Sequence, residues 1–394
     1  MFDLIKGRGR AVFASSDAVI YLFNFYKFIG LNPPSKYRIP YFIYSAIITS
    51  FSALLIPVLF SVSLYNDLNV LSIMEILQYL AGLLNTLAIP VKTLTFLSNV
   101  KSLRSIDTIL AKLDKYYTSP VDQIKIKRCA IFCNLLVFVF GVSYAMYMSA
   151  TSFGALVTGR ASYAFWIPYL DWRNSKLEYY VQFVFDFFVV FYALGHQLVY
   201  DTYPAIYIYI TRTQIQLLAR RVERLGYDEQ KRQDQNVNEL TECISVHQDI
   251  LTFVNIYKPV VSITIFAQFF VTAAILSVNM INIVIFANLQ TRIASCFYYF
   301  TVTLQTLPTC YQASQLEIDC EKLSLAIFHC NWGMQSKRFH NLLVYFLHRS
   351  QDLIPLTAMK LVPINLSTNL SIAKFSFSLY TFIQKMGLDD KLKK

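Results

Sequence analysis

The sequence predicts an all-α, polytopic membrane protein with seven transmembrane helices, a cytoplasmic N-terminus and a cytoplasmic helical anchor block. Three observations lead to this fold class. Hydrophobic residues make up 55% of the 394 residues and charged residues 15%, which is too apolar for an ordinary soluble protein. Apolar stretches long enough to cross a bilayer as helices recur along the chain, whereas the alternating segments of a barrel do not. Lys and Arg gather between these stretches, where they indicate topology.

The N-terminal segment is expected to be an amphipathic helix that lies in the membrane interface or re-enters it. Asp17, Asn24 and Lys27 interrupt its apolar run, and no small-residue cleavage pattern follows. No repeat or linker divides the rest, so we treat residues 1–394 as one transmembrane domain. Residues 287–292 are expected to form the turn between the fifth and sixth spans. The seven predicted spans are 41–63, 73–97, 129–153, 179–205, 259–285, 290–312 and 364–386.

The distribution of basic residues predicts the orientation of the chain across the membrane. With the N-terminus inside, the inner segments contain 24 Lys and Arg residues and the outer segments contain six. Such an excess favours a cytoplasmic N-terminus and an outer C-terminus, opposite to the arrangement of G-protein-coupled receptors. The inner segments compared are 1–38, 98–128, 211–250 and 313–360, and the outer segments are 64–72, 154–178, 286–289 and 387–394.

The inner segments 211–250 and 313–350 have apolar residues at helical spacing and should form the anchor block beneath the membrane. We expect the apolar face of 313–350, including Leu343 and Phe346, to contact other subunits.

An enzyme is not indicated, and no cofactor or metal is expected. The five His residues form no HExxH pattern, and no Gly-rich loop suits a phosphate. A net charge of +11 is compatible with nucleic acid, but the basic residues lie between apolar blocks, so the expected partner is the lipid bilayer. A secondary transporter of a small solute is the alternative, because Pro57, Pro90, Pro204 and Pro308 interrupt spans. However, the two halves show no matched pair of broken helices.

Aromatic and ionisable residues within the spans are the candidates for a ligand site. Asp186, with Gln182 one turn before it, forms either an interhelical hydrogen bond that fixes packing or the polar point of a ligand cavity. Aromatic residues in the outer halves of the second to fourth spans form either packing belts or an apolar pocket for small ligands. Glu75, Lys92, Lys258 and Arg292 are expected to snorkel at span ends. The candidate ligand-binding residues are Tyr79, Tyr144, Tyr147, Phe183, Asp186 and Phe187.

The last span has a polar stripe. Its members recur every three or four residues, which keeps them near one face of a helix. A membrane helix with such a face needs a neighbour or a water path beside it. The stripe consists of Ser367, Ser371, Lys374, Ser378, Thr381 and Lys385.

Several segments, in order, resemble those of the insect odorant receptors. The resemblance covers nearly the whole chain and is strongest from Cys310 to Ile383. One departure lies in the closing motif, where Phe377 lacks the usual Tyr hydroxyl and Tyr380 carries one where Phe is common. The segments that carry the resemblance are FIGLNPP, FWIPYLDWRNSKLEYYVQF, QLLARRVERLG, HQDILTFVNIYKPVVSITIFAQF, CYQASQL, LAIFHCNW and LHRSQDLIPLTAMKLVPINLSTNLSIAKFSFSLYTFI.

This resemblance implies the ligand-tuning subunit of an odorant-gated, non-selective cation channel. The chain would form a heterotetramer with the odorant co-receptor in the cell membrane of an olfactory neuron dendrite, and a small volatile compound would be its ligand. Alignment of the last span implies a gate near Tyr380, with Ile383 and Gln384 a turn further out. Periodicity instead directs Ser378 and Thr381 to the pore. We favour the Tyr380 face, since a closed gate should be apolar enough to dewet, and the stripe would then bond to neighbouring spans.

Overall fold

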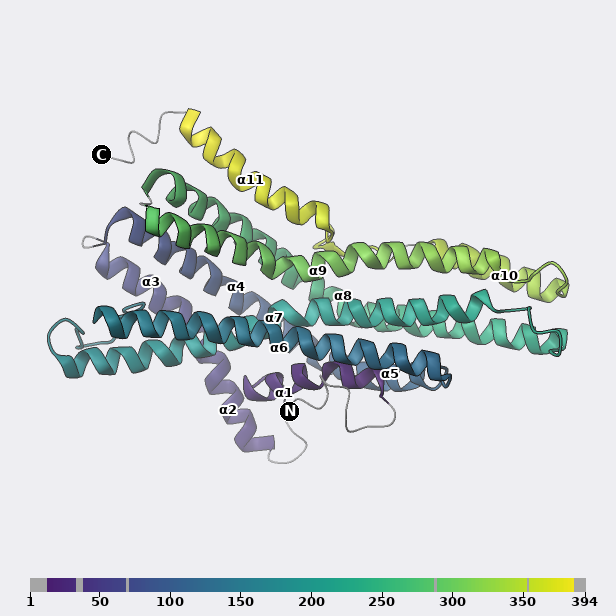
Figure 1. The fold of residues 1–394 in the computed structure, drawn as a ribbon. Helices are drawn as coiled ribbons and strands as arrows, with labels where there is room; N and C mark the ends of the chain where they lie inside the picture. The colour runs from purple at the N-terminus through teal and green to yellow at the C-terminus, as the bar shows by residue number, and fades with distance from the viewer. Residues whose placement is uncertain (1–12, 33–37, 69–70, 287–288, 353, 386–394) are drawn as a thin grey trace.

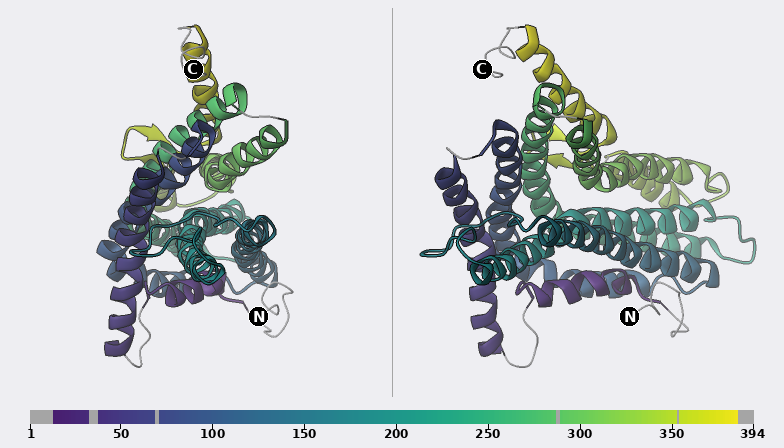
Figure 2. Two further views of the ribbon diagram at one scale, coloured as in Figure 1. Left: turned by 90° about the vertical axis from the view of Figure 1, so that its left-hand side faces the viewer. Right: turned by 60° about the vertical axis from the view of Figure 1, so that its left-hand side comes forward.

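The computed structural model describes residues 13–32, 38–68, 71–286, 289–352 and 354–385. In this part of the chain nearly every residue is helical, and the long helices lie side by side in an elongated bundle (Figure 1). The two views of Figure 2 show the N-terminal helices and the C-terminal helix on opposite sides of this bundle.

The N-terminal segment packs against the bundle itself. The 3₁₀-helix η1 (Ser15–Val19) and α1 (Ile20–Phe28) lie beside α6 (Pro120–Thr158). The Asn134 side chain of α6 accepts a hydrogen bond from the Tyr21 N–H at 3.1 Å and donates one to the Asp17 carbonyl at 2.8 Å. Leu22 and Tyr26 are fully buried, so the apolar side of this segment faces protein.

The first two predicted spans correspond to an antiparallel pair of helical segments. The first combines α2 (Arg38–Ser50), the π-helical turn η2 (Phe51–Leu55) and α3 (Ile56–Asp67). The second is α4 (Ile73–Arg104), which begins with a capping box between Ser72 and Glu75. The short α5 (Ile106–Asp114) then leads to α6, whose C-terminus is capped by Gly159 in the left-handed conformation (φ 64°).

Three long helices connect the apolar part of the molecule to its polar end. They are α7 (Lys176–Glu223), α8 (Gln233–Ile281) with the π-helical turn η3 (Asn282–Phe286), and α9 (Leu289–His329). Each continues through an internal proline, at Pro204, Pro259 and Pro308 respectively. The turn expected at 287–292 falls partly on residues 287–288, which lie outside the described residues; α9 already begins at Leu289.

The C-terminal region consists of α10 (Lys337–Gln351), a two-stranded antiparallel hairpin of β1 (Thr357–Ala358) and β2 (Val362–Pro363), and α11 (Leu366–Lys385). The Asn365 side chain accepts from the Thr368 N–H at 2.9 Å and so caps the first turn of α11.

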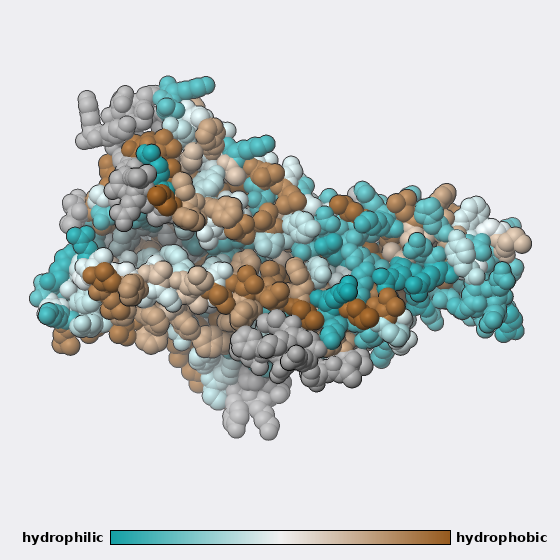
Figure 3. Space-filling model, viewed as in Figure 1, coloured by the Kyte–Doolittle hydropathy of each residue, from teal (hydrophilic) through white to brown (hydrophobic). Residues whose placement is uncertain are grey.

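Five segments of the described structure are long and apolar enough to cross a membrane: Ile39–Asp67, Glu75–Asp114, Pro120–Thr158, Lys176–Glu223 and Gln233–Ile285. They cover the first five predicted spans, except for residues 73 and 74 of the second. The sixth and seventh predicted spans fall on α9 and α11 and stay predictions. Figure 3 shows apolar surface over much of α6 and α7 in the left half of the view, and a hydrophilic end around α10.

The main hydrophobic core continues into the hydrophilic end, and its packing there corrects one expectation. Leu343 and Phe346 of α10, expected to contact other subunits, are buried within the chain. The Phe346 ring lies edge-on to the His247 ring of α8, with centroids 5.6 Å apart. Burial, reinforced by the nearby charge of Arg349, lowers the pKa of the His247 imidazole to about 4, so this ring packs in its neutral form. The expectation was wrong because helical spacing identifies an apolar face but not what covers it.

Candidate functional site

A cavity of about 590 Å³ lies between α3, α4, α6, α8 and α9. This volume suits a small organic ligand. Its apolar wall includes Phe60, Ala81 and Val278. Two glycines, Gly82 and Gly154, also line the cavity, and an added Cβ at Gly154 would meet no atom within 4 Å.

Tyrosine hydroxyls form the polar part of the cavity wall. The hydroxyls of Tyr147 on α6 and Tyr163 in the following loop are 2.6 Å apart and share a hydrogen bond. Tyr79 of α4 donates to the Tyr163 carbonyl at 2.7 Å, and Tyr298 of α9 completes this part of the wall. The cavity therefore joins phenol groups from three helices and a loop to a mostly apolar surface.

Asp186 holds the loop that covers the cavity. Its carboxylate accepts hydrogen bonds from the backbone N–H groups of Tyr163, Ala164 and Phe165 at 3.1–3.3 Å. Gln182 donates to the same carboxylate at 2.6 Å and to the Phe165 carbonyl at 2.9 Å. These bonds hold Ala164 in a positive-φ conformation (44°). Asp186 thus serves the loop, and it does not line the large cavity.

Phe183 and Phe187 lie beside Asp186 around a separate void of about 10 Å³, which is too small for an odorant-sized ligand. Phe187 is exposed and contacts Phe188 edge-on. Of the six predicted ligand residues, Tyr79 and Tyr147 line the large cavity, while Phe183, Asp186 and Phe187 surround the small void.

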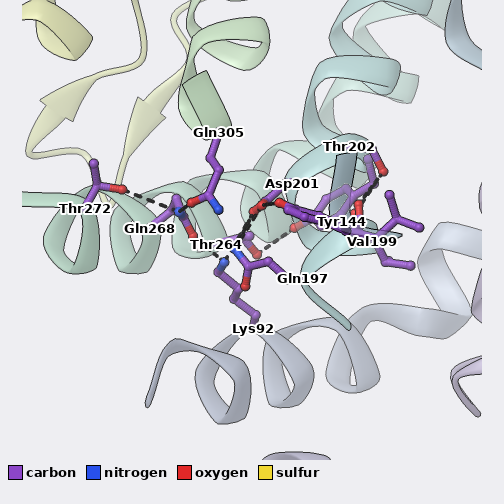
Figure 4. Close-up of polar contacts among 12 residues, drawn as sticks. Lys92, Tyr144, Gln197, Val199, Asp201, Thr202, Thr264, Gln268, Thr272 and Gln305 are labelled. Atoms are coloured by element: carbon purple, nitrogen blue, oxygen red, sulfur yellow. Dashed lines mark hydrogen bonds and ion pairs between the residues drawn. The ribbon is translucent and has the colours of Figure 1, made fainter. Parts of the chain in front are cut away.

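The sixth predicted ligand residue, Tyr144, belongs to a buried polar cluster (Figure 4). Its hydroxyl donates to Asp201 at 2.5 Å, and Gln197 donates to both Asp201 oxygens at 2.9 Å. Lys92 of α4 approaches the same carboxylate at 3.7 Å, and the exposed fractions of the Lys92 and Asp201 side chains are 0% and 1%. The expectation that Lys92 snorkels at a span end is therefore wrong.

Amides extend this cluster to α9. Lys92 also donates to Gln268 of α8, and Gln268 in turn donates to Gln305 of α9 at 3.3 Å. In Figure 4 the side chains of Lys92, Gln268 and Gln305 point toward one another from three separate helices. Burying a charge in an apolar interior is costly unless the charge is paired and hydrogen-bonded, and here both conditions are met.

The helix α11 presents two different faces. One packs on α9, where Asn369 donates to Thr306 at 2.7 Å and the Ser376 and Tyr299 hydroxyls are 2.7 Å apart. The other carries the stripe members Ser367, Ser371, Lys374 and Ser378, all exposed. The Ser371 hydroxyl donates to the Ser367 carbonyl of its own helix, and the expected bonds to neighbouring spans are not formed within the described chain.

Residues proposed for the gate lie further along α11. Tyr380 is half-buried with its ring next to Phe377, and Gln384 is exposed. The Thr381 hydroxyl donates to the Ser378 carbonyl at 2.8 Å. The side chain of Ile383 lies outside the described part of the structure.

Several residues at these sites were missed by sequence reasoning. Tyr163 lies in a loop and Tyr298 in a span full of aromatic residues, so neither carries a distinguishing local pattern. Asp201 did carry a signal, because an acidic residue within one apolar span and Lys92 within another are natural partners.

Comparisons with known proteins agree on one family. The family model described as "7tm Odorant receptor" matches residues 72–377. Odorant receptor 42a of Drosophila melanogaster is 34% identical, with 96% of this chain and 94% of that protein covered. Odorant receptor 43b of the same species is 32% identical over the same shares.

Solved structures of the olfactory receptor OR5 from Machilis hrabei share the fold. One matches with a TM-score of 0.73 at 15% identity, covering 93% of this chain and 100% of that one. A second, of OR5 in complex with eugenol, matches with a TM-score of 0.72. The chain belongs to the insect odorant receptor family.

Proposed function

We propose that this protein is the ligand-tuning subunit of an odorant-gated, non-selective cation channel assembled with the odorant co-receptor. The observation that carries this proposal is the cavity of about 590 Å³, which is lined by tyrosines and apolar residues in a member of the odorant receptor family. The related OR5 has been solved with eugenol, a compound of suitable size for such a space.

The proposed arrangement in the membrane has seven spans in a single domain, 1–394. The five apolar segments supply the first five spans, and α9 and α11 supply the sixth and seventh. The excess of Lys and Arg in the inner segments supports a cytoplasmic N-terminus and a cytoplasmic anchor block. Dendrites of olfactory neurons are the proposed location.

The proposed contact with the co-receptor is the apolar outer face of the anchor block. On α9, Tyr311, Ile318 and Leu325 recur every seven residues and are exposed in the single chain; exposed Trp332 continues the spacing just beyond the end of the helix. Val344 of α10 is also exposed, at 67%. Exposed apolar residues at heptad spacing, on a helix that extends from the proposed sixth span into the anchor block, are typical of a helix that packs against another chain. A heterotetramer would cover this face.

We infer the pore-lining face of α11 from the side of this helix that the rest of the chain does not cover. Ser378 points about 160–180° away from Asn369 and Ser376, which face α9, because each residue advances 100° around a helix. Tyr380 lies within about 40° of Ser376 and therefore toward the chain's own bundle. This geometry supports Ser378 and Thr381 as pore-facing, with Tyr380 and Gln384 as the alternative set.

Patch recording tests the proposal. Cells that express the chain with the co-receptor should show odorant-evoked unitary currents with a reversal potential near 0 mV in mixed Na⁺ and K⁺, as expected of a non-selective channel. A carrier would instead give a small saturating current that follows one solute gradient.

Cysteine substitutions along 376–385, treated from outside with a charged thiol reagent, would identify the pore-lining face of α11. Block at 378 and 381 supports the stripe, and block at 380 and 384 supports the alternative.

A further inference from the structure

The hydroxyl of Tyr298 is a hydrogen-bond donor at the cavity wall that the protein itself does not use. Tyr298 lines the cavity, and within the described residues its hydroxyl has no hydrogen-bond partner. It lies near enough to Tyr147 and Tyr163 for electrostatic interaction with both. In the Tyr147–Tyr163 pair only one O–H can be donated between the two oxygens, so a second O–H remains available there.

Several other polar groups of the wall are already engaged in hydrogen bonds. The hydroxyls of Thr151 and Thr158 donate to carbonyls of their own helix, and Asn279 donates to the Ser295 carbonyl at 2.8 Å. Asn282 has an unpaired Oδ1, but less than 1 Å² of that oxygen is accessible from the empty cavity. Exposed Arg160 adds only donors. Gln78 and Asn279 also line the cavity and carry amide oxygens that can accept hydrogen bonds. Among the described wall residues, the Tyr298 hydroxyl is therefore an unused donor that lies beside the Tyr147–Tyr163 pair.

From the unused Tyr298 hydroxyl we propose that the cavity selects uncharged small ligands that carry a carbonyl oxygen, such as ketones and esters, and that this hydroxyl donates the recognising hydrogen bond. The inference rests on the proposed function, since it concerns the ligand of the same cavity. A bound ligand without a hydrogen-bond acceptor would bury the Tyr298 hydroxyl without a hydrogen-bond partner. Sites built to form a hydrogen bond reject analogues that cannot form it.

Ligand pairs that differ only by C=O in place of C=CH₂ isolate this contact. Acetophenone and α-methylstyrene form one pair, and 2-heptanone and 2-methyl-1-heptene form another. For the chain assembled with the co-receptor, we expect the half-maximal concentration of each ketone to be about tenfold lower than that of its alkene. Tyr298→Phe should bring this ratio close to one.

Tyr299→Phe is the matched control. Tyr299 neighbours Tyr298 on α9, but its hydroxyl bonds to Ser376 and to the Ala373 carbonyl of α11. It should change the responses to ketone and alkene alike and leave the ratio at about tenfold. A ratio near one in the wild type, or a ratio that Tyr298→Phe does not change, would overturn the inference. A preference for 1-phenylethanol over acetophenone that survives Tyr298→Phe would also overturn it, because the ligand would then be donating its hydrogen bond rather than accepting one.

A second measurement separates this inference from the proposed function. The rise in melting temperature of the purified complex with each ligand, corrected for the co-receptor alone, reports binding without any current. Selective stabilisation by ketones without ligand-evoked current would support the inference and refute the channel. Equal currents from ketone and alkene, with equal stabilisation, would support the channel and refute the inference.

Discussion

Lys92 and Asp201 show at the scale of single residues how an apolar bundle holds charge. Both charged groups of this ion pair have further hydrogen-bond partners. Asp201 also accepts hydrogen bonds from Tyr144 and Gln197, and Lys92 also donates one to Gln268. Removing one partner of such a pair leaves an uncompensated buried charge, which costs more than the pair itself contributes.

Lys92→Met should therefore destabilise the protein by about 3–5 kcal/mol. The double variant Lys92→Met with Asp201→Leu should recover much of this loss, because neither charge then remains buried. Thermal unfolding in detergent checks both. The pair of exposed Lys112 and half-buried Asp249, 2.7 Å apart, is the control, and Lys112→Met should have little effect on stability because Lys112 stays in water. Equal losses for Lys92→Met and Lys112→Met would contradict this account.

Asp186 gives a second prediction at this scale. Asp186→Ala would leave the N–H groups of residues 163, 164 and 165 without their acceptor, at a cost of about 3 kcal/mol or more. Because the loop covers the cavity, all ligands should lose potency together. Asp171→Ala, at an exposed position of the same loop, should have little effect. If Asp186→Ala re-ranked the ligands at unchanged stability, Asp186 would be a ligand contact rather than a support of the loop.

At the scale of elements, the outer and inner faces of α9 and α10 have different roles. Leu325→Glu or Val344→Glu should reduce co-purification with the co-receptor and leave the chain folded, since both side chains are exposed (57% and 67%). Phe346→Glu should instead abolish expression, because Phe346 is fully buried. Asn341→Glu, at another exposed position of α10, is the matched control. Normal assembly of Leu325→Glu and Val344→Glu would rule out this face as the contact.

Sequence patterns predicted the elements better than their surroundings. Apolar length alone identified the first five membrane segments, because any helix that crosses a bilayer must be apolar for about 20 residues. The same rule does not say which side of a helix faces protein, so the roles of Lys92, Leu343 and Phe346 were misjudged. Cavity residues such as Tyr163 and Tyr298 come from distant parts of the chain, and only the tertiary packing brings them together.

At the scale of the whole molecule, the orientation can be tested with two exposed loop positions. Tyr169 lies in the loop between α6 and α7, and Tyr227 lies between α7 and α8. In a Cys296→Ser background, which removes the exposed cysteine, Tyr169→Cys should react with an impermeant maleimide on intact cells. Tyr227→Cys should react only after permeabilisation. The reverse pattern would invert the proposed topology.

The most direct test of the account is to fill the cavity in the assembled protein. Gly154→Phe places a ring in open space on the cavity wall, and Gly154→Ala adds a single methyl group at the same position. For complexes with the co-receptor at equal surface levels, we measure odorant-evoked current against concentration. Our account predicts that Gly154→Phe raises the half-maximal concentration of large odorants at least about tenfold. Gly154→Ala should stay close to wild type, and the basal current should be unchanged in both variants. An unaltered concentration–response curve for Gly154→Phe across odorants of all sizes would contradict it.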